Sequence, residues 1–261
     1  MRFADKVAIV TGAGGGLGAH YAAALAGEGA AVVVVDVAAE GVERTAAEIR
    51  GRGGKALPLV LDLTDAAQVE TLTPKAVEAF GRIDILVNNA GGGSSTPGNA
   101  SSIVGTEPPA WDVMMGVNLS TVFLCIRAVA PVMKQQRYGK IVNVSSRSAR
   151  VADPKFEQSP SYAAAKTAVL SLTRFAAREL GPFGITANCM VPALVLSGPV
   201  LEAYWQRLGQ AARDEYLEQV ALKRLPRIEE MTNVILFLCS DASSYVTGTA
   251  IEVNGGSYMP A

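Results

Sequence analysis

Histidine is almost absent from this chain, and that absence excludes two large classes of site. The 261 residues include one histidine, His20. A Ser-His-Asp hydrolase needs a histidine as its base, and a histidine-based metal site needs companion ligands. His20 has no cluster of Cys, Asp or Glu near it in the sequence. We therefore expect His20 on a helix surface or at an interface, and we expect no metal site.

Cysteine, net charge and long apolar runs are also scarce. The three cysteines, Cys125, Cys189 and Cys239, lie far apart in apolar runs, a pattern typical of buried free thiols in a reducing compartment. The formal net charge is −1, which gives no electrostatic reason to expect nucleic acid or an anionic membrane as a partner. No apolar stretch reaches the roughly 18 residues that span a bilayer, and the N-terminus does not resemble a signal peptide. We expect a cytoplasmic protein.

Short apolar runs alternate with helical patterns along the whole chain. Strands are predicted at 7–11, 31–36, 56–61, 83–88, 140–145, 185–190 and 250–253. Several of these runs are continuously apolar, as in strands that are buried on both faces. Helices are predicted at about 17–28, 39–52, 65–80, 111–136, 161–181, 201–220 and 229–239. The alternation predicts one doubly wound α/β domain over residues 1–261, in which a seven-stranded parallel sheet has helices on both faces.

Three long connections follow predicted strands, at residues 91–110, 147–160 and 191–200. The ends of parallel strands meet at one edge of the sheet, and ligands bind at that edge in open α/β folds. Long connections inside a compact domain are more often functional than idle. We therefore expect the site at this edge, with the segment after the sixth strand leading into an extra helix as a small lid.

A glycine-rich loop joins the first predicted strand to the first helix. In TGAGGGLG, residues 11–18, glycines let the backbone approach a pyrophosphate, and the helix N-terminus offers free N–H groups. Asp36 ends the next strand, where an acid can bind both ribose hydroxyls of an adenosine and repel a 2′-phosphate. The loop holds no Arg or Lys and Val37 follows the acid, so no cation is expected to neutralise a 2′-phosphate. The sequence predicts NAD rather than NADP.

Tyr162 and Lys166 are four residues apart, so on a helix they share one face. A phenol with a pKa near about 10 is a poor base at neutral pH. A nearby ammonium, together with the positive charge of an oxidised nicotinamide, would lower that pKa and favour the phenolate. By spacing alone such a pair is more often a packing contact, but the upstream nucleotide loop and Asp36 favour a reaction centre.

Further motifs follow the glycine loop in a fixed order. They are DILVNNAG (84–91), GVNLSTVFL (116–124), KIVNVSS (140–146), YAAAK (162–166), GITANCMVPA (184–193) and VTGTAIEVNGG (246–256). Together with the loop they closely resemble the short-chain dehydrogenase/reductase family over essentially the whole chain. The resemblance implies a Rossmann domain and an NAD-dependent oxidoreductase that interconverts a secondary alcohol and a ketone by hydride transfer.

The same resemblance implies roles for individual residues. Tyr162 accepts the alcohol proton, and Lys166 binds the nicotinamide ribose. Ser146 holds the substrate oxygen, although its distance of sixteen residues from Tyr162 leaves Ser148 open as the alternative. Asn118 opens its helix and holds a water that connects Lys166 to solvent. The cofactor-binding residues are expected to be Gly12, Gly14, Gly15, Gly16, Leu17, Gly18, Asp36, Asp62, Leu63, Asn89, Ala90, Gly91, Tyr162, Lys166, Pro192, Val195 and Ser197.

The substrate and the assembly are less closely defined. The loops and the lid offer Val151, Phe156, Leu194, Leu196, Tyr204, Trp205 and Leu208, which suit an apolar or aromatic substrate or equally pack the lid onto the domain. Arg147, Arg150 and Lys155 could instead bind a carboxylate. An NADP-linked ketone or 3-oxoacyl reductase and a non-catalytic nucleotide-binding protein stay open as alternatives. The family resemblance also implies a homo-oligomer, a tetramer or a dimer, built from helices 111–136 and 161–181.

Overall fold

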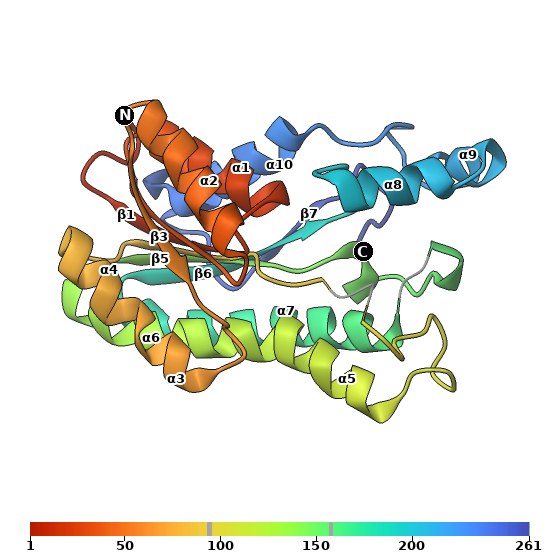
Figure 1. Cartoon of the computed structure of the whole chain (residues 1–261), viewed down its shortest axis with the longest axis horizontal. Coiled ribbons are helices and arrows are strands. Elements are labelled where there is room, and N and C mark those ends of the chain that lie inside the picture. The colour runs from red at the N-terminus through yellow and green to blue at the C-terminus, as the bar shows by residue number, and fades with distance from the viewer. Residues whose placement is uncertain (93–95, 157–158, 261) are drawn as a thin grey trace.

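The computed structural model describes residues 1–92, 96–156 and 159–260. Seven parallel strands form its central sheet (Figure 1). They are β1 (Val7–Thr11), β2 (Ala31–Asp36), β3 (Lys55–Val60), β4 (Ile85–Asn88), β5 (Gly139–Val144), β6 (Ile185–Pro192) and β7 (Ala250–Val253). The strand order is β3-β2-β1-β4-β5-β6-β7, so the direction of winding reverses between β1 and β4. This is the doubly wound sheet that the sequence predicted, and ligands bind at such a reversal.

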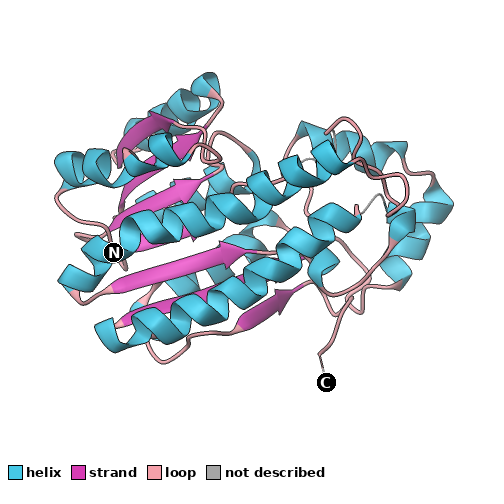
Figure 2. Ribbon diagram, turned by 90° about the horizontal axis from the view of Figure 1, so that it is seen from below, coloured by secondary structure: helices cyan, strands magenta, loops and turns pink. Residues whose placement is uncertain are grey.

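Helices cover both faces of the sheet (Figures 1 and 2). One face carries α1 (Gly16–Gly27), α2 (Ala39–Gly51) and α10 (Ile228–Cys239), and the other carries α3 (Ala66–Glu70), α4 (Leu72–Phe80), α6 (Thr121–Gln136) and α7 (Pro160–Leu180). Successive strand residues face opposite sides: Ile9 belongs to the core beneath α6 and α7, and Val10 to the core beneath α1 and α10. Burial on both faces explains why the strand sequences are continuously apolar.

Three of the predicted helices are interrupted. The predicted helix 65–80 is two helices, α3 and α4, which meet at Thr71. The predicted helix 111–136 begins earlier, as α5 (Pro108–Met115), and passes through a π-helical turn at Gly116–Ser120 into α6. The predicted lid helix 201–220 is α8 (Pro199–Arg207) and α9 (Gln210–Glu218), which are separated by Gly209, a residue that weakens helix interiors.

One helix in the described part of the chain is long and apolar enough to cross a membrane by length and composition alone. It is the continuous segment Pro108–Gln136. This segment was not predicted from the sequence, because Gly, Asn, Ser and Thr interrupt its apolar residues. Val122, Cys125 and Val129 of this segment lie in the core beneath the sheet. Its apolar face is therefore used in packing, and the segment by itself is weak evidence for a membrane.

The scarce residue types lie where their sequence context placed them. Cys125, Cys189 and Cys239 are free and buried, as predicted. His20 is exposed on α1. Among the described residues, no group of three or more His, Cys, Asp and Glu side chains could hold a metal ion.

Candidate functional site

A cavity of about 700 Å³ lies at the carboxyl edge of the sheet, where the sequence predicted a site. It is bounded by the glycine loop, the segments after β4, β5 and β6, the start of α7 and the lid helices. The predicted cofactor residues that line it are Gly12, Gly15, Gly16, Leu17, Asn89, Gly91, Tyr162, Lys166, Pro192, Val195 and Ser197. One cavity therefore joins the predicted nucleotide end to the predicted reaction centre.

The glycine loop offers an open backbone surface at the start of α1. Gly15 precedes the first residue of α1 and no side chain caps the helix, so its first N–H groups remain available to an anion. A side chain at Gly15 would meet nothing within 4 Å, whereas one at Gly12 would lie 2.8 Å from Cα of Ala90. Gly18 packs directly on the carbonyl of Gly12, where no side chain fits. The loop is open to a pyrophosphate at Gly15 and closely packed at Gly12 and Gly18.

The predicted adenosine end of the site carries a negatively charged side chain and, contrary to the sequence prediction, a positively charged one. Asp36 accepts hydrogen bonds from the N–H groups of Gly14 (3.0 Å) and Ala38 (3.1 Å). Arg44 of α2 donates through Nη2 to the carbonyl oxygen of Gly14 at 2.9 Å. The prediction that no cation is available here was wrong, because α2 returns Arg44 to the loop. Asp36 and Arg44 therefore both hold Gly14, and both charges lie beside the predicted ribose position.

Some of the predicted cofactor residues also shape the loops around the cavity. Asn89 lines it, but its Nδ2 also donates to the carbonyl oxygens of Thr11 and Gly12, each at 3.2 Å. Asp62 accepts hydrogen bonds from the backbone and hydroxyl of Thr64 at 2.9 and 2.6 Å, and the Leu63 side chain packs in the core. The expected contact of Asp62 and Leu63 with adenine stays a prediction. Because the Leu63 side chain is in the core, only the Leu63 backbone could make that contact.

Tyr162 and Lys166 lie together at the start of α7. Ser159 accepts a hydrogen bond from the backbone N–H of Tyr162 at 3.2 Å, which fixes the first turn of the helix. The ammonium of Lys166 lies 5.7 Å from the centre of the Tyr162 ring and donates to the carbonyl oxygen of Val144 at 3.0 Å. Lys166 is 3% exposed, and this burial lowers its pKa to about 8. The lysine is thus held in place beside the phenol.

The protonation of Tyr162 differs from the sequence prediction. Burial raises the pKa of Tyr162, and a hydrogen bond with Ser146 lowers it by less. The sequence had predicted a lowering by Lys166 and the nicotinamide together. In the chain by itself, burial is the largest influence on the pKa of Tyr162. The phenol is therefore neutral at pH 7 in the chain alone.

The serines after β5 have separate partners. The Ser146 hydroxyl donates to the Ser148 hydroxyl and accepts the Ser148 N–H, both at 3.2 Å, and it lies near enough to Tyr162 to lower the pKa of the phenol. Both Ser146 and Ser148 line the cavity. Ser145 donates to the backbone carbonyl of Lys166 at 2.7 Å, so its hydroxyl is used in binding backbone. The influence of Ser146 on the pKa of Tyr162 favours Ser146 over Ser148 as the serine that holds substrate.

Asn118 is buried in the π-helical turn beneath the cavity. Its Nδ2 donates to the carbonyl oxygens of Gly92 (2.8 Å) and Met114 (3.0 Å), and its Oδ1 accepts the Gly92 N–H at 2.9 Å. A side chain at Gly91 would lie 2.7 Å from Oδ1 of Asn118 and 2.9 Å from Nζ of Lys166. Asn118 and Lys166 therefore flank the same small space. The water link between them stays a prediction.

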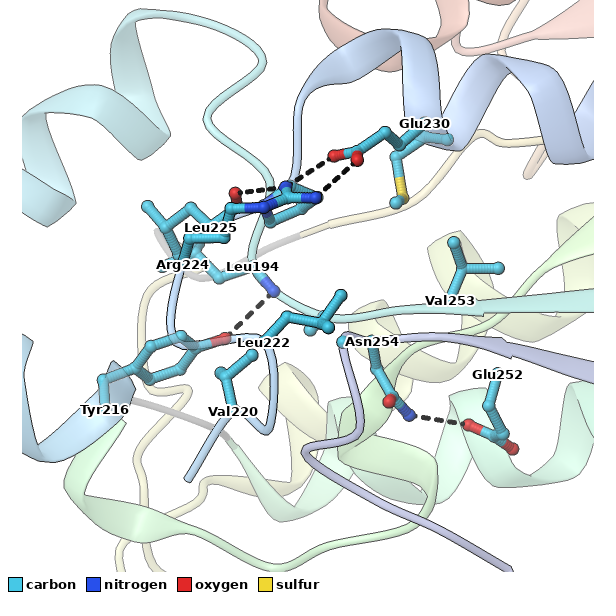
Figure 3. Close-up of a pocket in the computed structure, with 14 residues that line it drawn as sticks. Leu194, Tyr216, Val220, Leu222, Arg224, Leu225, Glu230, Glu252, Val253 and Asn254 are labelled. Atoms are coloured by element: carbon cyan, nitrogen blue, oxygen red, sulfur yellow. Dashed lines mark hydrogen bonds and ion pairs between the residues drawn. The ribbon is translucent and has the colours of Figure 1, made fainter. Parts of the chain in front are cut away.

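Tyr216 of α9 anchors the lid, and sequence reasoning missed it. Its hydroxyl accepts the N–H of Leu194 at 3.1 Å (Figure 3). Its ring meets those of Phe156 and Trp205 edge-on, at 5.0 and 5.8 Å between centres. Tyr216 also borders a second cavity of about 210 Å³ (Figure 3). A lone tyrosine in the polar stretch RDEYLEQV gave little signal of a buried position, and part of the predicted substrate pocket packs the lid instead.

Comparisons with known proteins agree with this arrangement. A family model described as Enoyl-(Acyl carrier protein) reductase matches residues 12–258. The chain is 38% identical to a 3-oxoacyl-[acyl-carrier-protein] reductase of Thermotoga maritima, covering 98% of this chain and 99% of the relative. It is 39% identical to a cyclohexanol dehydrogenase of Rhodococcus sp. strain TK6, covering 96% and 95%. A solved 7α-hydroxysteroid dehydrogenase, complexed with NADH and 7-oxo glycochenodeoxycholic acid, has a TM-score of 0.88 and 32% identity, covering 98% and 95%. The chain therefore belongs to the short-chain dehydrogenase/reductase family, a family of oxidoreductases.

Proposed function

We propose that this oxidoreductase is an NAD-dependent dehydrogenase of a secondary alcohol, or a reductase of the matching ketone. One observation carries the proposal: Ser146, Tyr162 and Lys166 line the cavity that the glycine loop opens into, and the ammonium of Lys166 lies 5.7 Å from the centre of the Tyr162 ring. A hydroxyl pair that can hold one substrate oxygen, with a cation behind it, suits proton transfer at a carbinol or a carbonyl. A scaffold protein has no need of this arrangement.

The chain supplies binding, orientation and proton transfer. A bound nicotinamide supplies the hydride acceptor for oxidation or the hydride donor for reduction. In oxidation Tyr162 takes the alcohol proton, and in reduction it returns a proton to the carbonyl oxygen. Ser146 holds that oxygen beside the phenol, and Lys166 stabilises the phenolate through its charge. Asn118 fixes the loop at Gly92, and thereby the wall of the cavity next to Lys166.

The proposed preference for NAD rests on Asp36. Its carboxylate lies at Gly14 of the loop, where it would accept ribose hydroxyls and repel a 2′-phosphate. Arg44 beside the same glycine opposes the preference, but its guanidinium is already bonded to a carbonyl oxygen. The relative that was solved with NADH supports the proposal.

The substrate is proposed to have an apolar or aromatic body. Val200, Leu201 and Phe156 line the cavity, and the similar Rhodococcus enzyme is named for cyclohexanol. The Thermotoga relative is named for 3-oxoacyl groups on acyl carrier protein, so an acyl thioester is the second candidate.

The proposed assembly is a cytoplasmic homotetramer built on α6 and α7. Phe123 of α6 and Phe175 of α7 are 49% and 74% exposed in the single chain, and aromatic side chains are enriched at interfaces. Size-exclusion chromatography with light scattering tests this directly. A monomer would refute the proposal.

The proposed reaction is tested by following NADH formation at 340 nm with a panel of secondary alcohols. The panel should include cyclic, aryl and steroid alcohols and a 3-hydroxyacyl thioester, each with NAD and with NADP. Turnover of at least one alcohol with NAD is expected. Turnover of no alcohol and no thioester with either cofactor would contradict the proposal, and turnover of the thioester with NADP alone would favour the second candidate.

A further inference from the structure

Arg147 is a buried cation in the wall of the cavity. It follows Ser146 directly and begins the short 3-10 helix Arg147–Ala149. Only 4% of the residue is exposed, and it lines the cavity together with Ser146 and Tyr162. A buried charge is unfavourable unless other groups pair with it and hydrogen-bond to it. The partners of Arg147 are therefore informative about what the cavity binds.

Those partners satisfy only part of the guanidinium. Nη2 donates to Oε1 of Gln219 at 2.6 Å. Nη1 lies 3.8 Å from Oδ2 of Asp153, too far for a hydrogen bond. Within the described part of the chain, Nε and Nη1 have no hydrogen-bond acceptor. Arginine offers five N–H donors in a planar fork, so most of the hydrogen-bonding capacity of this buried side chain has no partner within the described residues.

The neighbouring cations do not share this property. Arg150 ends the same turn, but its Nε donates to Oε1 of Glu252 at 2.9 Å and it does not line the cavity. Lys155 is paired with Glu215 at 2.6 Å, and both side chains are largely exposed. Of the three basic residues that the sequence suggested for a carboxylate, Arg147 alone lines the cavity, and its Nε and Nη1 have no hydrogen-bond acceptor within the described residues.

We propose that Arg147 binds a carboxylate of the substrate, so that the site takes hydroxy acids or oxo acids with an apolar or aromatic body. The inference rests on the proposed alcohol–ketone reaction and adds the substrate's second functional group. A carboxylate supplies the paired oxygens that match the planar guanidinium. The substrate carboxylate would also help to neutralise the charge of the Arg147 guanidinium, which lies 3.8 Å from the carboxylate of Asp153. Because Arg147 adjoins Ser146 in the chain, the anionic end and the reacting oxygen of the substrate are held by successive residues.

The test uses oxo acids of increasing spacer length, each paired with its own primary amide. The readout is the ratio of kcat/KM for the acid to kcat/KM for the amide, together with equilibrium binding of both compounds by calorimetry. For the best acid, Arg147→Met should lower that ratio by about 10- to 100-fold, as expected for loss of a charge-assisted hydrogen bond. The matched control is Arg150→Gln, which removes an ion-paired arginine from the same turn and should leave the ratio unchanged.

Asp153→Asn supplies an effect of opposite sign. Removing the carboxylate beside Arg147 should tighten binding of the acid and raise the ratio, whereas a merely structural Arg147–Asp153 contact would loosen the site for both compounds alike. If every amide is turned over at least as well as its acid in the wild type, or if Arg150→Gln lowers the ratio as much as Arg147→Met, the inference is wrong. If neither acids nor amides are turned over or bound, the inference is wrong for this site; turnover of other alcohols would still leave the proposed reaction standing.

Discussion

Replacing Asp36 should change the choice between NAD and NADP. The Asp36 carboxylate is fixed by the N–H groups of Gly14 and Ala38, so it cannot easily turn away from a 2′-phosphate. One pair of like charges at about 4 Å costs about 1 kcal/mol in water and up to about 4 kcal/mol near a protein surface. For this half-buried side chain and a nearly doubly charged phosphate we expect about 2 to 4 kcal/mol, or roughly 30- to 1,000-fold discrimination.

The assay compares kcat/KM for the two cofactors with one alcohol at fixed ionic strength. The wild type should prefer NAD by a factor in that range, and Asp36→Ala should remove most of the preference. Asp36→Asn separates charge from shape, because it keeps the side-chain size and loses only the negative charge. Both variants should also bind NAD more weakly, since a charge-assisted hydrogen bond to a ribose hydroxyl is worth about 1.5–3 kcal/mol.

Arg44 provides the matched control for this prediction. Once Asp36 is gone, the guanidinium of Arg44, which is bonded to the carbonyl oxygen of Gly14, is a positive charge at the loop that could attract a 2′-phosphate. Adding Arg44→Ala to Asp36→Ala should therefore weaken NADP more than NAD. A wild type that already prefers NADP, or an Asp36→Asn variant with unchanged discrimination, would refute the reasoning.

The remaining predictions concern the reaction centre and the loop. Because burial raises the pKa of Tyr162, kcat/KM should rise with pH for alcohol oxidation, which needs the phenolate, and fall for ketone reduction, which needs the phenol; identical pH profiles in both directions would contradict this. Ser146→Ala should lower kcat by about 100-fold or more and Ser148→Ala by much less, and steady-state kinetics showing the reverse order would identify Ser148 as the serine that holds the substrate. Gly18→Ala should lower the unfolding free energy by about 1–3 kcal/mol, because its new methyl group would meet the Gly12 carbonyl. Gly27→Ala places its methyl group in open space on the same helix, so it should be neutral or slightly stabilising. Thermal unfolding of both variants measures the difference.

Most of the fold could be predicted from the sequence because five of the seven strands, β1, β2, β4, β5 and β6, are largely buried on both faces. Runs such as AVVVVD are then continuously apolar, and the observed β2 has the predicted bounds. The helix interruptions could not be predicted in the same way. The π-helical turn at Gly116–Ser120 depends on Asn118 bonding to Gly92 across the site, a contact between residues that are far apart in the sequence.

The site was predictable where motifs encode local geometry and less so where it depends on the return of distant elements. Tyr162 and Lys166 share a helix, so their spacing alone puts them on one face. Arg44 and Tyr216 reach the site only through the packing of α2 and α9. The pKa of Tyr162 depends on burial, which a sequence does not give directly. For the same reason the sequence left Arg147 undecided between a solvated charge and a carboxylate ligand.

Tyr162→Phe tests the proposed chemistry most directly. The substitution keeps the ring beside Lys166 and removes only the phenolic hydroxyl. With binding of NADH confirmed by calorimetry, kcat for alcohol oxidation should fall by about 100- to 10,000-fold, the usual contribution of a positioned general base. Turnover within a few-fold of the wild type, with NADH still bound, would show that Tyr162 is not the proton-transfer group.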